Sequence, residues 1–169
     1  MRKIKKKPAG IAIGTLPLTI IMEEKAKTST TPTAVVSLKG VIEFEDKNCD
    51  EATLSKPLEA VLGGLFPVIV GHPEAWSTPF GQDLVTDLQD GPGVLLNFID
   101  EAHQHGADHW QQIRPEMKTV PGRLRIFLEP GSPTLAMSAT LTKSEVEALS
   151  ENLGFHEKPT ILESDSVQE

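Results

Sequence analysis

The chain has 169 residues, of which 38% are hydrophobic and 24% are charged, and this composition excludes a disordered chain and fits one soluble domain with a core. The formal net charge of -8 does not favour nucleic-acid binding by the protein as a whole, although basic residues gather at 2–7 and at 114–125. The single cysteine, Cys49, excludes an internal disulfide and a cysteine-based zinc ribbon, and it favours a reducing intracellular compartment.

The first residues imitate a secretory signal, because the basic RKIKKK at 2–7 precedes the apolar PAGIAIGTLPLTIIM. The apolar part contains two prolines, runs into Glu23 and Glu24, and lacks a small-x-small cleavage site. It is also too short to span a bilayer. We therefore predict a basic segment at 1–10, followed by a buried strand and the start of a helix, with a signal peptide as the alternative.

Short apolar runs then alternate with amphipathic ones along the chain. Continuous apolar runs of this length are typical of parallel strands that are buried on both faces. The predicted strands are 11–14, 34–38, 67–71, 94–99, 134–138 and 160–162, and the predicted helices are 18–27, 53–64, 80–89 and 142–153. Polar loops are predicted at 28–33 and 43–52. This alternation predicts an α/β fold, an open and mostly parallel sheet with flanking helices.

The helix predicted at 142–153 has the clearest boundaries. Thr142 can cap its first turn, Glu145 can complete a capping box, and Gly154 can supply the left-handed residue that ends it. One face of this helix carries apolar side chains that can pack against a sheet, namely Val146, Leu149 and Leu153.

Two acids, Asp100 and Glu101, directly follow the apolar run VLLNFI. Ligands of an open parallel sheet bind beyond the carboxyl ends of its strands. An aspartate there can hold Mg²⁺ through water, and a neighbouring glutamate can orient and deprotonate the water that attacks a γ-phosphate. A solvated strand end is the alternative interpretation of the two acids alone. The complete DEAH at 100–103, and SAT at 138–140 after another apolar run, favour a nucleotide site.

Several blocks of the sequence resemble the first RecA-like lobe of a superfamily-two helicase, and most closely a RecQ-type DNA helicase, over residues 11–165. IAIGTLPLTIIMEE resembles motif Ia, and FPVIVGHPEAW resembles the block before motif II. NFIDEAH resembles motif II, the Walker B motif, and TLAMSATLTKSEVEALSENLGF resembles motif III with its following helix. Between these two, HQHGADHWQQIRPEM resembles the aromatic-rich loop that couples DNA binding to hydrolysis in RecQ-type enzymes.

The resemblance implies ATP and Mg²⁺ as cofactors. By this resemblance Asp100 would hold magnesium-ATP, Glu101 would activate the water, and His103 would transmit the nucleotide state to Ser138 and Thr140. It also implies 3′ to 5′ movement on DNA that is single-stranded or has an overhang, and nuclear residence with RKIKKK as an address. The residues expected to face DNA by stacking or by phosphate contact are Pro17, Leu18, Pro73, Glu74, Trp110 and Arg114.

The phosphate loop that such a lobe needs, G-x-x-x-x-G-K-[ST], does not occur in the sequence. The family places it upstream of motif Ia, so we expect it before Met1, and we expect the second lobe with its arginine finger after the truncated tail at 166–169. The chain is thus expected to be a truncated or decayed part of a helicase, a P-loop NTPase lobe lacking its P-loop, and inactive on its own.

Two other interpretations remain open. One is a metal site formed by histidines and nearby acids, although their spacing matches neither H-E-x-x-H nor a zinc finger. Its candidate ligands are His103, His105 and His109 with Asp100, Glu101 or Asp108. The other is a noncatalytic α/β interaction module derived from a helicase.

Overall fold

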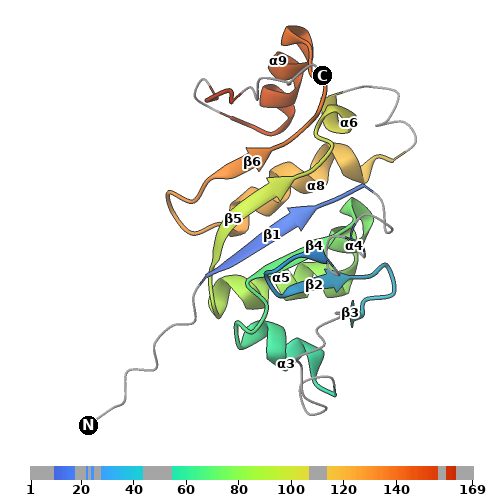
Figure 1. Ribbon diagram of the computed structural model, residues 1–169, viewed down its shortest axis with the longest axis vertical. Helices are drawn as coiled ribbons and strands as arrows, with labels where there is room; N and C mark the ends of the chain where they lie inside the picture. The colour runs from blue at the N-terminus through green and yellow to red at the C-terminus, as the bar shows by residue number, and fades with distance from the viewer. Residues whose placement is uncertain are drawn as a thin grey trace.

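A six-stranded sheet forms the centre of the part of the chain that the computed structural model describes, which is residues 10–17, 22, 24, 28–43, 55–106, 114–155 and 159–162 (Figure 1). Its strand order is β3-β2-β4-β1-β5-β6. The strands are β1 (Ile11–Thr15), β2 (Thr33–Val36), β3 (Ile42–Glu43), β4 (Val68–Gly71), β5 (Val94–Ile99) and β6 (Thr134–Ala136). Neighbouring strands pair in parallel, apart from β3, which runs antiparallel to β2. An open, mostly parallel α/β sheet with flanking helices is therefore confirmed.

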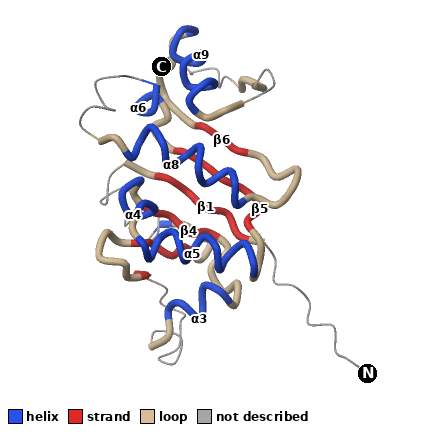
Figure 2. The backbone as a smooth tube through the Cα atoms, turned by 180° about the vertical axis from the view of Figure 1, so that it is seen from behind, coloured by secondary structure: helices blue, strands red, loops and turns tan. Residues whose placement is uncertain are grey.

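Helices cover one face of this sheet and one of its ends. Figure 2 shows α4, α5 and α8 lying across one face, with α6 and α9 at the end near β6. The helices are α3 (Pro57–Leu62), α4 (Pro73–Ser77), α5 (Pro79–Asp90), α6 (His103–Gly106), α8 (Glu116–Leu124) and α9 (Lys143–Asn152), with a 3₁₀ turn η1 (Arg125–Phe127). The main core lies between this face and the helices, where Ile11 and Ile13 pack with Trp76, Leu84 and Leu124.

The parallel arrangement brings the carboxyl ends of β1, β4, β5 and β6 to one edge of the sheet. Residues that follow these strands therefore meet, although they are far apart in sequence. Thr15 at the end of β1 pairs with Ile99 at the end of β5 and with Gly71 at the end of β4. This edge is where an open α/β sheet holds its ligands.

The predicted strands agree with the structure except at the last one. Residues 11–14, 34–38, 67–71, 94–99 and 134–138 overlap β1, β2, β4, β5 and β6. The strand predicted at 160–162 is wrong, because residues 159–162 have no regular structure and Ile161 and Leu162 are 56% and 86% exposed. Burial on both faces is also wrong for part of β5 and β6, where Leu95 is 49% and Leu135 is 43% exposed.

The predicted helices 80–89 and 142–153 are confirmed as α5 and α9, each within one residue at either end. The helix predicted at 53–64 is shorter, since α3 begins at Pro57 after the N-cap Lys56. Of the helix predicted at 18–27, the structure describes only Met22 and Glu24, both helical.

The predicted loops also need small corrections. The loop at 28–33 is shorter by one residue at each end, because Thr28 is helical and Thr33 joins β2. Glu43, assigned to the loop at 43–52, closes β3. The rest of that second loop lies outside the described residues. In the part of the chain that is described, no helix is long and apolar enough to cross a membrane.

Candidate nucleotide site and its coupling contacts

The two acids of the DEAH sequence lie directly after β5, at the edge where the carboxyl ends meet. The Asp100 amide donates to the Thr15 carbonyl at 3.0 Å, which fixes the exit of β5 against β1. The Glu101 amide donates to Asp100 Oδ1 at 3.1 Å, so the aspartate side chain stabilises its own turn. The Ala102 amide donates a hydrogen bond to the Met137 carbonyl at 2.8 Å. The acids are thus held between β1 and the segment that follows β6.

Glu101 adopts a left-handed backbone conformation, with a φ of 50°. A residue with a Cβ atom pays about 1 to 2 kcal/mol in this region. Such strain is concentrated at functional sites, where the surrounding contacts enforce it. The carboxylate stays accessible, since the Glu101 side chain is 36% exposed. The turn therefore presents a half-exposed carboxylate beside Asp100 at the edge of the sheet.

His103 connects this turn to the segment after β6. Its Nδ1 lies 3.0 Å from Ser138 Oγ and 3.3 Å from Glu101 Oε2. Ser138 Oγ donates to the Thr140 carbonyl at 3.2 Å and accepts from the Thr140 amide at 3.3 Å. The residues assigned to hydrolysis and to coupling therefore share one hydrogen-bonded cluster. Glu101 and Ser138 therefore both face the same Nδ1 of His103.

Helix α9 supports this cluster from outside. Thr142 accepts from the Glu145 amide and Glu145 from the Thr142 amide, which is the predicted capping box. Hydrogen bonds from the backbone and side chain of Thr142 hold the pKa of the Glu145 carboxyl below its ordinary value. Leu149 and Leu153 pack against Ile99 and Ala102. Helix α9 thus packs on the end of β5 and on the turn that follows it.

Arg114 forms a second connection near the same edge. Its Nε and Nη2 donate to Glu74 Oε1 and Oε2, both at 2.5 Å, and its Nη1 donates to the Pro17 carbonyl at 2.7 Å. Its Nη2 also lies 3.4 Å from His72 Nδ1. We call Arg114, Glu74 and Pro17 the arginine clasp. It joins the segment before α8 to α4 and to the segment after β1.

The clasp shifts the protonation of its members. Burial acts to raise the pKa of the Glu74 carboxyl, but the hydrogen bonds and charge of Arg114 bring this pKa below its ordinary value. Burial lowers the pKa of His72, and the nearby Arg114 charge lowers it further. At neutral pH the clasp is therefore a carboxylate and a guanidinium beside an uncharged imidazole.

The residues expected to face DNA lie in different environments. Pro17 and Pro73 are buried, while Glu74 and Arg114 are half-buried and bound to each other. Leu18 and Trp110 lie outside the described residues. The sequence did not indicate that Glu74 and Arg114 pair, because they are 40 residues apart and each matched a different motif.

The histidines do not come together as a metal site within the described residues, where no group of three or more His, Cys, Asp or Glu side chains is placed to hold a metal ion. His105 is buried, and its Nδ1 is hydrogen-bonded to the Met117 carbonyl. Burial lowers the pKa of His105, although the Met117 hydrogen bond opposes this. His109 and Asp108 lie outside the described residues.

The donor set at the end of β5 fits Mg²⁺ better than it fits a whole nucleotide. Asp100 and Glu101 supply carboxylate oxygens on a tight turn, and Mg²⁺ prefers oxygen ligands with several retained waters. A triphosphate also needs a cradle of backbone amides and a lysine, which the G-x-x-x-x-G-K-[ST] sequence would provide and which this sequence lacks.

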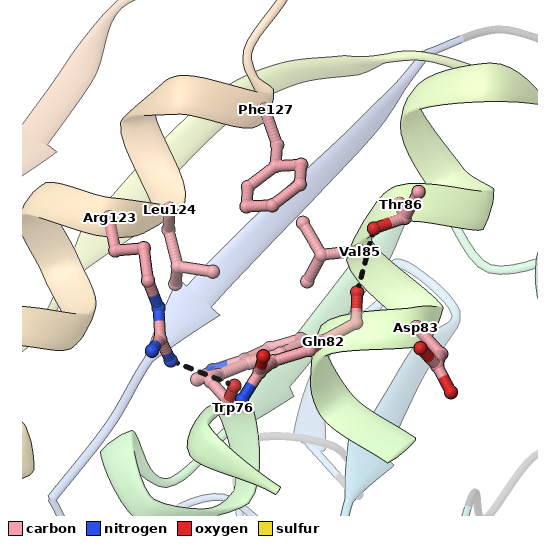
Figure 3. A pocket seen from close by; sticks show the side chains of 8 residues that line it. All are labelled: Trp76, Gln82, Asp83, Val85, Thr86, Arg123, Leu124 and Phe127. Atoms are coloured by element: carbon pink, nitrogen blue, oxygen red, sulfur yellow. Dashed lines mark hydrogen bonds between the residues drawn. The ribbon is translucent and has the colours of Figure 1, made fainter. Parts of the chain in front are cut away.

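A cavity of about 210 Å³ lies elsewhere, on the helix-covered face between α5 and the α8–η1 segment (Figure 3). Val85, Leu124 and Phe127 line it, and Arg123 at its rim donates to the Trp76 carbonyl at 3.2 Å. Small-molecule sites are usually larger, about 300 to 1,000 Å³. None of the predicted site residues lines this cavity, so it does not compete with the strand ends as the nucleotide site.

No protein-family model matches the chain, and no curated protein sequence matches it significantly. Among solved structures 43 chains match, including the helicase domain of Hef from Pyrococcus furiosus. That match has 16% sequence identity and a TM-score of 0.45, and covers 88% of this chain but 28% of the Hef chain. The chain thus spans less than a third of the length of that structure.

Proposed function

We propose that this chain is part of the ATP-binding lobe of an ATP-dependent DNA helicase of the RecQ-like type, which moves 3′ to 5′. One observation carries the proposal: His103 lies within hydrogen-bonding distance of both Glu101 and Ser138. A helicase lobe needs this contact between its hydrolytic turn and motif III. A strand end that is only exposed to solvent would not require a glutamate in a strained backbone conformation. Nor would it require a histidine that contacts a serine 35 residues away.

In this proposal each residue of the cluster has a separate task. Asp100 would hold Mg²⁺ through water, and the ion would supply positive charge for the triphosphate. Glu101 would orient the attacking water and accept its proton. His103 then bonds either Glu101 or Ser138, and a change at Glu101 alters the hydrogen bond that Ser138 receives. The nucleotide state is thereby passed to the segment that contains Thr140.

DNA is the proposed partner, and the arginine clasp is its proposed point of contact. Phosphate oxygens and the Glu74 carboxylate are similar ligands for a guanidinium, so a DNA phosphate would compete with Glu74 for Arg114. Replacement of Glu74 by a phosphate at Arg114 would also disturb the hydrogen bond from Arg114 to the Pro17 carbonyl. The net charge of -8 argues for contact at this local point and against binding over a broad basic surface.

Equilibrium binding of a fluorescent ATP analogue to the purified chain tests the nucleotide part of this proposal. We expect weak binding that requires Mg²⁺, because the phosphate cradle is absent from the sequence. Asp100→Asn should reduce the affinity about tenfold, which corresponds to about 1.4 kcal/mol. Asp90→Asn, which changes an exposed acid at the far end of α5, is the matched control. Equal affinity with and without Mg²⁺, or in wild type and Asp100→Asn, would contradict the proposal.

A noncatalytic α/β interaction module is the second candidate. The exposed side chains Leu95 and Leu135 on β5 and β6 favour it, because exposed apolar side chains can contact a partner. An interaction module predicts no Mg²⁺-dependent nucleotide binding, so the same titration separates the two candidates.

A further inference from the structure

Helix α8 contains a proline in its interior, at Pro121. In a regular helix the amide of residue 121 would donate to the carbonyl of residue 117. Proline has no amide hydrogen, and its ring pushes the preceding-turn carbonyl aside. The Met117 carbonyl therefore lacks its usual helical donor, although Met117 itself is 1% exposed.

His105 supplies the missing donor. This residue lies in α6, is 1% exposed, and places its Nδ1 against the Met117 carbonyl. A carbonyl oxygen only accepts hydrogen bonds, so the hydrogen must be on Nδ1. The contact therefore selects one of the two neutral tautomers of the ring, and it does so through a carbonyl that Pro121 leaves available.

Two more side chains tie neighbouring elements to the same point. Asn152 of α9 donates from Nδ2 to the His105 carbonyl at 3.1 Å. Asn97 of β5 donates from Nδ2 to the Pro121 carbonyl at 3.3 Å. The His105 and Pro121 region thus joins α6, α8, α9 and β5 by side-chain hydrogen bonds between residues distant in sequence.

The two ends of this connection carry residues of the candidate site. His103 lies two residues before His105 on the same short helix and contacts Ser138. Arg114 lies just before α8, where the Met117 amide donates to the Arg114 carbonyl at 3.0 Å. A fixed link between His105 and Met117 therefore holds the segment that contains His103 against the segment that begins with the arginine clasp.

We infer that His105 is a positioning residue, and that Pro121 keeps the Met117 carbonyl available for it. The bond between them sets how α6 lies relative to α8, and hence how His103 lies relative to Arg114. The assigned benefit to coupling rests on the proposed helicase function, whereas the bond and its dependence on Pro121 do not.

Imidazole ¹⁵N NMR of the purified chain tests this inference without any ligand. In wild type we expect His105 to show a protonated Nδ1 and an unprotonated Nε2. In Pro121→Ala the new amide can donate to the Met117 carbonyl, so His105 should lose its fixed Nδ1–H tautomer. The ring signals of His103 should shift as well, because α6 is no longer held. A protonated Nε2 in wild-type His105, or unchanged His105 and His103 signals in Pro121→Ala, would overturn the inference.

Pro115→Ala provides the matched control. It makes the same substitution at the N-cap of α8, where an added amide finds no helical carbonyl to bond, so the signals of both histidines should stay in place.

His105→Phe gives a second variant that keeps a ring in the buried site but removes the donor. We expect it to shift the His103 signals as Pro121→Ala does, and unchanged His103 signals would count against the positioning role. If instead the helicase proposal is wrong, the wild-type chain will show no Mg²⁺-dependent nucleotide binding, while His105 will still show the Nδ1–H tautomer.

Discussion

Glu101 combines a conformation that glutamate rarely adopts with the position expected of a hydrolytic carboxylate. A glycine would adopt the same φ of 50° without steric cost, so the backbone alone gives no reason for a glutamate there. The neighbouring contacts of Asp100 with Thr15 and of Ala102 with Met137 enforce the turn. At the scale of single residues, we read this strain as the cost of presenting a carboxylate to a ligand.

Substitution of Glu101 by glycine should therefore leave stability unchanged or raise it by up to about 1 kcal/mol, because relief of left-handed strain offsets the added chain entropy. The denaturant midpoint in urea measures this. Glu147→Gly, in the exposed part of α9, should instead lose about 1 kcal/mol. A loss at Glu101 as large as that at Glu147 would show that the turn is not strained.

At the scale of elements, the arginine clasp joins α4 to the segments after β1 and before α8. Its bidentate geometry and partial burial distinguish it from an exposed ion pair, which contributes little. The pKa of Glu74 is lowered in the folded protein, so this carboxyl contributes stability above its unfolded pKa and loses that contribution as pH falls through its folded pKa. The clasp should weaken in acid and stay intact at neutral pH.

A double-mutant cycle with Arg114→Ala and Glu74→Ala should give a coupling energy of about 1 to 2 kcal/mol at pH 7. The coupling should disappear at a pH below the folded pKa of Glu74, where the carboxyl is protonated. Urea unfolding at both pH values measures the effect. The exposed pair of Lys56 and Glu59, 3.0 Å apart on α3, is the control and should couple by less than about 0.5 kcal/mol. Equal coupling of the two pairs would contradict a special role for the clasp.

The capping box of α9 offers a second test at this scale. Thr142→Ala removes the side chain that accepts from the Glu145 amide, and it should cost about 1 kcal/mol of stability. Thermal unfolding measures this against Thr119→Ala, an exposed threonine within α8 that should change stability by less than about 0.5 kcal/mol. If the two variants are equally stable, the capping box adds no stability beyond that from the packing of Leu149 and Leu153.

The elements that sequence alone could predict are those with local causes. β1, β4 and β5 are short apolar runs, and α9 has Thr142, Glu145 and Gly154 at its ends, so periodicity and capping sufficed. Helix α8 was missed because Pro121 and Gly122 argue against a helix, while buried contacts of its apolar face outweigh them. Residues 160–162 are as apolar as a strand but pair with no strand among the described residues, and Ile161 and Leu162 stay exposed.

The site could be predicted only in part, because some of its contacts depend on tertiary packing and not on local sequence. DEAH and SAT indicated that Asp100, His103 and Ser138 act together, and the structure brings His103 and Ser138 to 3.0 Å. The pairing of Arg114 with Glu74 and the bond of His105 to Met117 depend on tertiary packing. Neither leaves a spacing that can be recognised along the chain.

At the scale of the whole molecule, the sheet brings the turn with Asp100 and Glu101 and the segment with Ser138 to one edge, while the sequence lacks a phosphate loop. The isolated chain should therefore release no phosphate from ATP above background. A sensitive phosphate-release assay checks this, with Glu101→Gln as the control. Turnover that Glu101→Gln abolishes would show that another part of the chain cradles the phosphates.

Paramagnetic broadening by Mn²⁺–ATP tests the central claim most directly, because Mn²⁺ can replace Mg²⁺ at oxygen ligands and reports its position by NMR. We expect selective loss of the amide signals of Asp100, Glu101 and His103, followed by Ser138, with α3 and the far end of α5 unaffected. Asp100→Asn should restore these signals. Broadening centred on any other part of the sheet, or uniform broadening that Asp100→Asn does not change, would contradict a nucleotide site at the end of β5.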